Sequence, residues 1–168
     1  ILRLLGHGGM GAVYLAEDVR LGKTWAVKEN FGTTPDARQR FQDEAKLLAS
    51  LQKHPNLALV VDYFFVESTG GQYLVMEYIE GDDLEKIILA QGKTSEAEAR
   101  KWLGGLLDAV EYLHQQNPPV IHRDIKPANI KISGNAAILV DFGIAKMLVP
   151  GQMTATRIFA ATPGFAPP

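Results

Sequence analysis

Short apolar or alternating runs, separated by turns, open the chain. They lie at residues 1–5, 12–17 and 23–29. This pattern is typical of β-strands, and the glycines within 6–11 together with Leu21-Gly22-Lys23 predict the turns of an antiparallel meander. Two further runs, at 57–65 and 72–78, flank the turn-rich stretch 68–71 and predict a hairpin. The first half of the chain is therefore expected to form five strands.

The period of the apolar residues becomes that of a helix in two places. The first helix is predicted from Pro35 to Leu51, where apolar residues recur at helical spacing. The second begins at Ser95, which forms a capping box with Glu98, and ends before Pro118. Its apolar face comprises Ala99, Trp102, Leu103, Leu106, Leu107, Val110 and Leu113. Each helix therefore presents one face that can pack on a core.

Two short strands are predicted late in the chain, at 130–132 and 137–140, around the turn Ser133-Gly134-Asn135. Asn129 precedes the first strand and Asp141 follows the second. Because the two strands form a hairpin, these polar residues are expected at neighbouring strand ends, where their side chains can converge on one ligand.

Composition narrows the class of protein without naming a function. The chain has 168 residues, of which 46% are hydrophobic, and this suits a folded globular chain. Its formal charge of -2 excludes a strongly basic surface, so neither nucleic acid nor anionic lipid is expected as the main partner. The chain has no Cys, as suits a reducing compartment. No apolar run approaches the roughly 18 residues that a membrane-spanning helix needs.

The first candidate site is the glycine-rich run Gly6-His7-Gly8-Gly9-Met10-Gly11, which matches G-x-G-x-x-G. A dinucleotide-binding turn has the same pattern but continues into a helix, whereas 12–16 is strand-like; Glu29, at a suitable distance for a ribose, is then coincidental. A P-loop would need Lys and Ser or Thr where Ala12 and Val13 stand. This motif alone also allows a tight turn without a ligand. Its context favours a hairpin whose backbone lies over phosphates.

The second candidate site is the run His122-Arg123-Asp124-Ile125-Lys126-Pro127-Ala128-Asn129, which Asp141-Phe142-Gly143 follows. It supplies an Asp for a substrate hydroxyl, a Lys for a phosphate, and an Asn and a second Asp for magnesium. These are the charges that phosphoryl transfer from ATP requires.

Lys28, at the end of the third predicted strand, is ambiguous on its own, because a strand Lys is usually a solvated outward residue. Glu44 changes this interpretation. It lies on the following predicted helix, beside the apolar face, where it can pair with Lys28 and hold the ammonium against the α- and β-phosphates.

Taken together, these motifs resemble the eukaryotic-type protein kinases, and most closely the bacterial Ser/Thr kinases. The resemblance covers the whole chain. In family order the matching residues are 6–11, Val13, Lys28, Glu44, His54-Pro55-Asn56, Met76-Glu77-Tyr78, 122–129 and 141–143. It implies an α+β, two-lobe fold: an N-lobe at 1–79 with a five-stranded antiparallel sheet and one helix, then an incomplete, mainly helical C-lobe at 80–168.

The resemblance also implies roles for the catalytic residues. Asp124 would accept or orient the proton of the substrate hydroxyl, and Lys126 would contact the transferring phosphate. Asn129 and Asp141 would bind Mg²⁺, which Mn²⁺ could replace. Lys28, paired with Glu44, would bind the phosphates of ATP.

Further residues are implied in nucleotide binding. Phosphates would lie under the loop that contains Gly6, Gly8, Gly9 and Gly11. Val13 and Ala26 would cover the adenine ring, whose edge would bond the backbone of Glu77 and Ile79. Met76 would guard the pocket behind this hinge, and Asp83 would lie near the ribose.

Ser and Thr substrates are implied by Lys126, which tyrosine kinases replace, and by Thr162 in the substrate-docking loop. In kinases of this type the Arg that precedes the catalytic Asp, here Arg123, meets a phosphate on the activation segment. Thr154 and Thr156 are therefore candidate autophosphorylation sites.

The last residues depart from the family pattern. Ala161 and Phe165 replace a more frequent Gly and Tyr, and Pro167-Pro168 resembles a variant of the closing motif that then lacks its Glu. The residues expected to stack through both lobes are Leu48, Val60, Phe142 and His122. Since helices of the C-lobe would be missing, we expect a truncated segment that is poorly stable and prone to aggregate when expressed alone.

The sequence is therefore interpreted as an ATP-dependent Ser/Thr protein kinase domain that transfers the γ-phosphate to protein hydroxyls. The competing interpretations are a non-catalytic pseudokinase scaffold that binds nucleotide, and a fragment that is inert for want of its remaining helices. A cytoplasmic location is expected for this segment, with any membrane anchor outside it.

Overall fold

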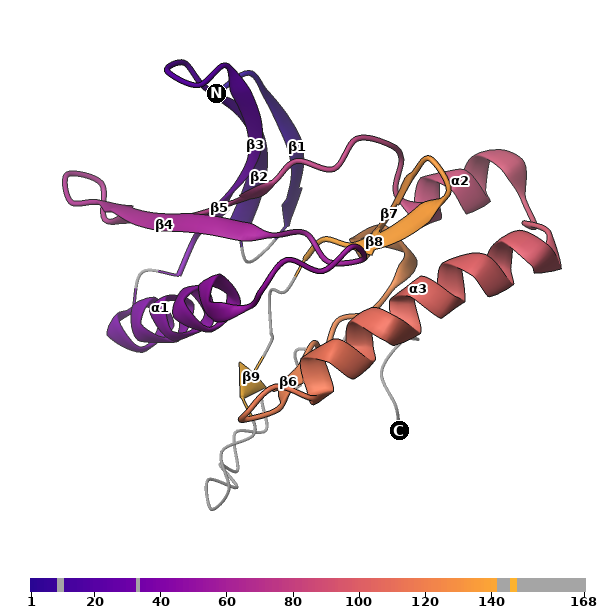
Figure 1. Cartoon of the computed structure of the whole chain (residues 1–168). Coiled ribbons are helices and arrows are strands. Elements are labelled where there is room, and N and C mark those ends of the chain that lie inside the picture. The colour runs from indigo at the N-terminus through magenta and orange to yellow at the C-terminus, as the bar shows by residue number, and fades with distance from the viewer. Residues whose placement is uncertain (9–10, 33, 142–145, 148–168) are drawn as a thin grey trace. The chain divides into compact units, whose positions relative to one another are not determined.

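The computed structural model describes residues 1–8, 11–32, 34–141 and 146–147. The chain divides into two compact units (Figure 1). The first unit contains Ile1–Lys53 and Ala58–Tyr78, and the second contains His54–Leu57 and Ile79–Pro168. The short segment 54–57 thus interrupts the first unit and belongs to the second.

The first unit is built on one antiparallel sheet of five strands, in the order β1-β2-β3-β5-β4. The strands are β1 (Arg3–Gly8), β2 (Gly11–Asp18), β3 (Lys23–Asn30), β4 (Val60–Val66) and β5 (Gly71–Glu77). The predicted five-stranded sheet is confirmed. The fourth strand, however, begins at Val60 and not at Leu57, because Leu57 forms an isolated parallel bridge with Leu139 in the second unit.

Helix α1 (Pro35–Ser50) packs against β4 and β5, as Figure 1 shows. It begins where predicted, because the hydroxyl of Thr34 accepts a hydrogen bond from the backbone N–H of Ala37 at 3.2 Å, and Pro35 needs no donor in the first turn. The helix buries the residues of its apolar face, Phe41, Ala45, Leu47 and Leu48.

The register of the sheet separates its residues into two faces. Val13 on β2 lies opposite Lys28 on β3, and Lys28 lies opposite Leu74 on β5, so these three share one face. Along β5 the residues Gln72, Leu74 and Met76 are buried, while the alternate positions are only half-buried. The face that carries Lys28 is therefore the more covered one.

The second unit combines two helices with short strands. Its elements in the described part of the chain are α2 (Leu84–Gln91), α3 (Glu96–His114), β6 (Val120–Ile121), the 3₁₀ turn η1 (Pro127–Asn129), β7 (Ile130–Ser133), β8 (Ala136–Leu139) and β9 (Lys146–Met147). Strands β7 and β8 form the predicted hairpin, and β6 pairs with β9. Among the residues that the structure describes, no helix is long and apolar enough to cross a membrane.

Helix α3 begins with the capping box that the sequence predicts. The hydroxyl of Ser95 accepts from the backbone N–H of Glu98, and the carboxylate of Glu98 accepts from the backbone N–H of Ser95, each at 3.2 Å. Hydrogen bonds from Ser95 and Thr94 hold the pKa of Glu98 below its ordinary value. The apolar face is only partly covered: Leu113 is buried, whereas Leu103 and Leu107 are 55% and 58% exposed.

The segment 54–57 is fixed by several contacts within the second unit. The ring of His54 stacks on Tyr112 of α3, with centroids 5.1 Å apart. The amide Nδ2 of Asn56 donates to the backbone oxygen of Ala137 at 2.8 Å, and the backbone oxygen of Asn56 accepts from the N–H of Leu139 at 2.9 Å. This segment is therefore held against both α3 and the β7–β8 hairpin.

Two adjacent glycines of α3 give a matched test of this packing. A methyl group at Gly104 would meet no atom within 4 Å, whereas one at Gly105 would overlap Nδ2 of Asn56. Gly104→Ala should stabilise the protein by up to about 1 kcal/mol through helix propensity. Gly105→Ala should destabilise it, because the amide of Asn56 must move and lose its hydrogen bond to the backbone oxygen of Ala137.

Thermal unfolding followed by circular dichroism checks this pair of substitutions. We expect the melting temperature to rise for Gly104→Ala and to fall for Gly105→Ala. A shift of the same sign and size for both would contradict the packing described for Asn56.

Candidate active site

Three predicted site residues, two catalytic and one metal-binding, meet in the second unit. Nζ of Lys126 lies 2.8 Å from Oδ2 of Asp124, in an ion pair whose side chains are 23% and 17% exposed. Nδ2 of Asn129 donates to the same carboxylate oxygen at 2.8 Å and to the backbone oxygen of Asp124 at 2.9 Å. The carboxylate of Asp124 is thus held by an ammonium and an amide.

The backbone before Asp124 makes a sharp turn. Arg123 has φ = 67°, and it is the one residue other than glycine with a positive φ in the described part of the chain. Such a conformation costs about 1–3 kcal/mol and is often found at functional sites. His122 is buried at 2% exposure, and its Nδ1 accepts from the N–H of Asp124 at 3.3 Å. A buried ring and a strained turn therefore set the direction of Asp124.

Asn129 is positioned by the turn η1 and by the β7–β8 hairpin. Its backbone N–H donates to the backbone oxygen of Lys126 at 2.9 Å, and its backbone oxygen accepts from the N–H of Val140 at 3.1 Å. Val140 directly precedes Asp141, which is half-buried. Asn129 and the residue beside Asp141 are therefore joined by a backbone hydrogen bond.

The donor set fits a hard divalent cation. Because Nδ2 of Asn129 faces Asp124, its Oδ1 remains as an oxygen ligand, and Asp141 can supply a carboxylate. No group of three or more His, Cys, Asp or Glu residues with metal-binding geometry occurs in the described residues. One amide and one carboxylate suit Mg²⁺, which commonly takes its other ligands from water and substrate phosphates.

The remaining predicted residues that are described lie in the first unit or at the start of the second. Val13 and Lys28 share one face of the sheet, as do Ala26 and Met76, which are opposite each other on β3 and β5 and are buried. Glu44 lies half-buried on α1. The pairing of Lys28 with Glu44 stays a prediction.

The glycine-rich run connects two strands. Gly8 at the end of β1 lies opposite Gly11 at the start of β2, so the two strands pair up to these glycines; Gly9 and Met10 are outside the described residues. The following segment is a strand and not a helix, which excludes the dinucleotide-binding turn. A side chain at Gly11 would overlap the backbone oxygen of Glu29, so only glycine allows this close approach.

The hinge residues have few side-chain contacts. The N–H of Glu77 donates to the oxygen of Leu59 at 2.8 Å, and its carboxylate lies 3.9 Å from the ammonium of the exposed Lys53. Ile79 is half-buried. Adenine is predicted to contact the backbone of these residues. Their side chains therefore give no sign of that contact.

Asp83 has a structural role that the sequence interpretation missed. It caps helix α2: Oδ1 accepts from the N–H of Lys86 at 2.9 Å, and Oδ2 pairs with Nζ of Lys86 at 2.8 Å. Partial burial opposes ionisation of this carboxyl, but the bonds from Lys86 and the charges of Lys86 and Lys131 outweigh it and lower the pKa of Asp83. The sequence signal for this helix cap is an Asp directly before an apolar run.

Several predicted residues cannot be placed in this site. Phe142, Gly143, Thr154, Thr156, Ala161, Thr162, Phe165 and Pro167-Pro168 lie outside the described residues, as does Gly9. Of the expected stack, Leu48 and Val60 are buried in the first unit and His122 is buried in the second.

Comparisons with known proteins agree with these motifs. The protein kinase domain family matches residues 1–168. A probable serine/threonine-protein kinase of Streptomyces coelicolor is 37% identical over 163 residues, covering 94% of this chain and 24% of the relative. Serine/threonine-protein kinase B of Synechocystis is 36% identical over 185 residues, covering 99% and 32%.

Serine/threonine-protein kinase PknB of Mycobacterium tuberculosis is 37% identical over 163 residues, which is 94% of this chain and 26% of that protein. The chain therefore spans between about a quarter and a third of the length of these relatives.

The cap of α2 gives a test of the Asp83 geometry. Asp83→Ala removes the cap and should cost about 1 kcal/mol of local stability, or about fivefold in the protection of the first-turn amides against hydrogen exchange. Asp83→Asn keeps an acceptor and should cost less.

The charge of Asp83 adds a pH dependence. Since the folded pKa is lowered, the contribution of the ionised form is present above the unfolded pKa of about 3.9 and is lost as the pH falls through the lower folded value. The difference in protection of the first-turn amides between wild type and Asp83→Asn should therefore shrink below about pH 3.9. Equal protection in wild type and Asp83→Ala at neutral pH would contradict the cap.

Proposed function

Because the chain belongs to the protein kinase domain family, we propose that the protein containing it transfers the γ-phosphate of ATP to Ser or Thr hydroxyls of proteins. The observation that carries this proposal is the arrangement of Asp124, with Lys126 and Asn129 both within 2.8 Å of its Oδ2. It supports the proposal because it brings together a carboxylate that can accept a proton, an ammonium that can bind a phosphate, and an amide whose oxygen can bind a metal.

Asp124 accepts the proton of the substrate hydroxyl as the oxygen attacks the γ-phosphorus. An oriented base of this kind contributes about 10²–10⁴ in rate. Asn129 donates one hydrogen bond to the carboxylate and one to the backbone oxygen of Asp124, so the base is oriented before substrate arrives and little reorganisation is needed during the reaction.

Lys126 stabilises the negative charge on the transferring phosphoryl group. Its ammonium pairs with Asp124 in this structure, and its flexible side chain lets it reach a phosphate beside that carboxylate. Oδ1 of Asn129 and the carboxylate of Asp141 would hold Mg²⁺, for which Mn²⁺ can substitute. The bound cation would neutralise charge on the β- and γ-phosphates.

Most of the proposed nucleotide contacts come from residues of the first unit, while Ile79 and Asp83 belong to the second. Lys28, paired with Glu44, binds the α- and β-phosphates, and the backbone of the glycine-rich hairpin covers them. Val13 and Ala26 contact adenine, whose edge bonds the backbone of Glu77 and Ile79. Met76 lies behind the base, and Asp83 lies near the ribose in addition to capping α2.

The organisation and setting of the domain belong to the same proposal. The lobes are 1–79 and 80–168, the partners are ATP and protein substrates, and the location is cytoplasmic. A pseudokinase scaffold is less well supported, because Lys28, Glu44, Asp124, Asn129 and Asp141 are all present.

Phosphate transfer by the full-length protein tests the proposed mechanism. With labelled ATP, Mg²⁺ and a protein substrate, Asp124→Asn should lower kcat by about 10²–10⁴ while ATP binding is kept. Asp108→Asn, which changes an exposed carboxylate of α3, is the matched control and should transfer at the wild-type rate. Equal incorporation by wild type and Asp124→Asn would show the mechanism to be wrong.

Autophosphorylation is a separate prediction. After incubation of the full-length protein with ATP and Mg²⁺, mass spectrometry should find phosphate on Thr154 or Thr156, and Asp124→Asn should carry none. The physical reason is the Arg123 guanidinium, which can make a charge-assisted contact with such a phosphate. Unmodified peptides across 144–162 in the active wild type would refute it.

A further inference from the structure

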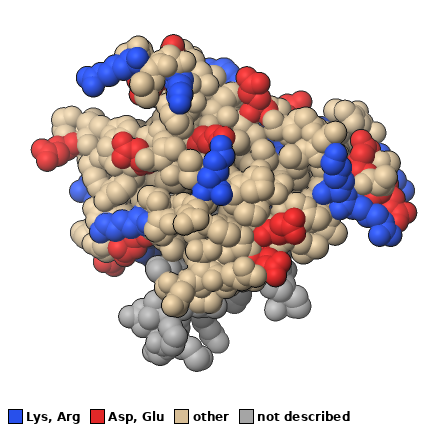
Figure 2. Space-filling view, viewed as in Figure 1, with Lys and Arg blue, Asp and Glu red and all other residues tan. Residues whose placement is uncertain are grey.

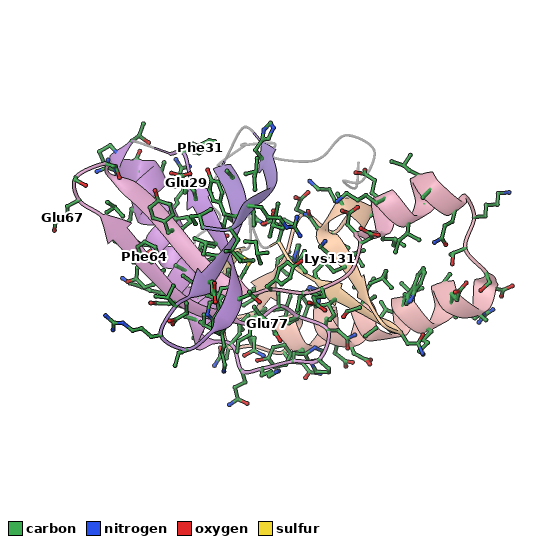
Figure 3. The ribbon with its side chains drawn as sticks, turned by 90° about the horizontal axis from the view of Figure 1, so that it is seen from above. Glu29, Phe31, Phe64, Glu67, Glu77 and Lys131 are labelled. Atoms are coloured by element: carbon green, nitrogen blue, oxygen red, sulfur yellow. The ribbon has the colours of Figure 1, made fainter. Side chains whose placement is uncertain are left out.

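Glu29 is bound by two tyrosines from the neighbouring strands. The hydroxyl of Tyr14 on β2 donates to its Oε2 at 3.0 Å, and the hydroxyl of Tyr73 on β5 donates to its Oε1 at 2.9 Å. Phe64 of β4 stacks on the ring of Tyr73, with centroids 5.0 Å apart; Glu29 and Phe64 are labelled in Figure 3. We call Glu29, Tyr14 and Tyr73 the Glu29 clamp.

The register places this clamp on the face of the sheet opposite Lys28. Glu29 lies opposite Ala12 on β2 and opposite Tyr73 on β5, and Tyr14 is two residues from Ala12. Directly opposed residues and alternate residues of a strand share a face. Because Lys28 is adjacent to Glu29 in β3, its side chain points to the other face, together with that of Val13.

The clamp also lies where the glycine-rich hairpin joins the sheet. The backbone oxygen of Glu29 occupies the space that a side chain at Gly11 would need, and the next residue, Ala12, is 3% exposed. Strand β2 therefore begins in tight contact with β3 at Glu29. Any movement between these strands changes the position of both Gly11 and Lys28.

Both carboxylate oxygens of Glu29 accept a hydrogen bond, and these bonds connect strands β2, β3 and β5. The hydrogen bond from each phenol to Glu29 is the main reason why the pKa values of Tyr14 and Tyr73 are raised. The three side chains are half-buried. Figure 2 shows acidic and basic side chains interspersed on one face of the molecule.

We propose that Glu29 is a positioning residue for nucleotide binding: through Tyr14 and Tyr73 it fixes the strands that carry Gly11 and Lys28, and so sets where the phosphates of ATP are held. This inference rests on the proposed kinase function. Glu29 acts through the backbone, since its own side chain is on the opposite face from Lys28.

Release of the clamp should weaken nucleotide binding more than it slows chemistry. The test uses the full-length protein with two variants, Glu29→Leu and the double variant Tyr14→Phe/Tyr73→Phe, which keeps both rings. Two variants serve as matched controls. Glu67→Gln changes an exposed carboxylate at the β4–β5 turn. Tyr63→Phe changes a phenol of β4 that lies opposite Leu74, on the face of the sheet away from the clamp.

Three quantities are measured for each variant: Kd for a non-hydrolysable ATP analogue with Mg²⁺ by calorimetry, KM for ATP with kcat, and the melting temperature. We expect both clamp variants to raise Kd and KM by about threefold to tenfold, the range for losing one or two hydrogen bonds, with kcat within about twofold of wild type. Both controls should match wild type.

Unchanged Kd and KM in the two clamp variants would overturn the inference, even if their melting temperatures fall, because the clamp would then be structural only. If Glu29→Leu does not fold, the double Tyr variant decides the outcome alone. A wild-type protein that binds the analogue but transfers no phosphate would contradict the proposed kinase function, while Kd would still test the clamp. A wild-type protein that binds no nucleotide would overturn both.

Discussion

The chemistry of this domain depends on how the two ends of the Asn129 amide are used. The nitrogen donates to the carboxylate and to the backbone oxygen of Asp124, at 2.8 and 2.9 Å. A carboxylate accepts hydrogen bonds only, so it can be paired with the nitrogen end but not with the oxygen end. The oxygen of Asn129 therefore points away from Asp124 and is available to a cation. In the proposed mechanism, one side chain thus orients the base and supplies a metal ligand.

The local scaffold holds this arrangement in place. The positive φ of Arg123 turns the chain between β6 and η1, and the burial of His122 anchors the turn. The β7–β8 hairpin then holds Asn129 beside the strand that leads to Asp141. In the first unit, strand β3 likewise carries two residues with different proposed roles. Lys28 is on the face proposed for ATP, and Glu29 is on the opposite face.

Features with a local cause could be predicted from the sequence. The five strands and both main helices follow from periodicity, and the start of α3 follows from the capping box at Ser95. Features with partners far along the chain could not. The late start of β4 arises because Leu57 pairs with Leu139, and the hydrogen bond from Tyr73 to Glu29 joins residues that are 44 positions apart. The resemblance implies a ribose contact for Asp83, although its capping of α2 is local and could be recognised from the sequence.

The most direct test of this account is a crystal structure of the full-length protein with Mg²⁺ and a non-hydrolysable ATP analogue. The account predicts that Nδ2 of Asn129 stays within hydrogen-bonding distance of Asp124, that Oδ1 of Asn129 binds the metal, and that Asp141 is a second protein ligand. A metal held without Asn129, or an Asn129 side chain turned away from Asp124 in that complex, would contradict it.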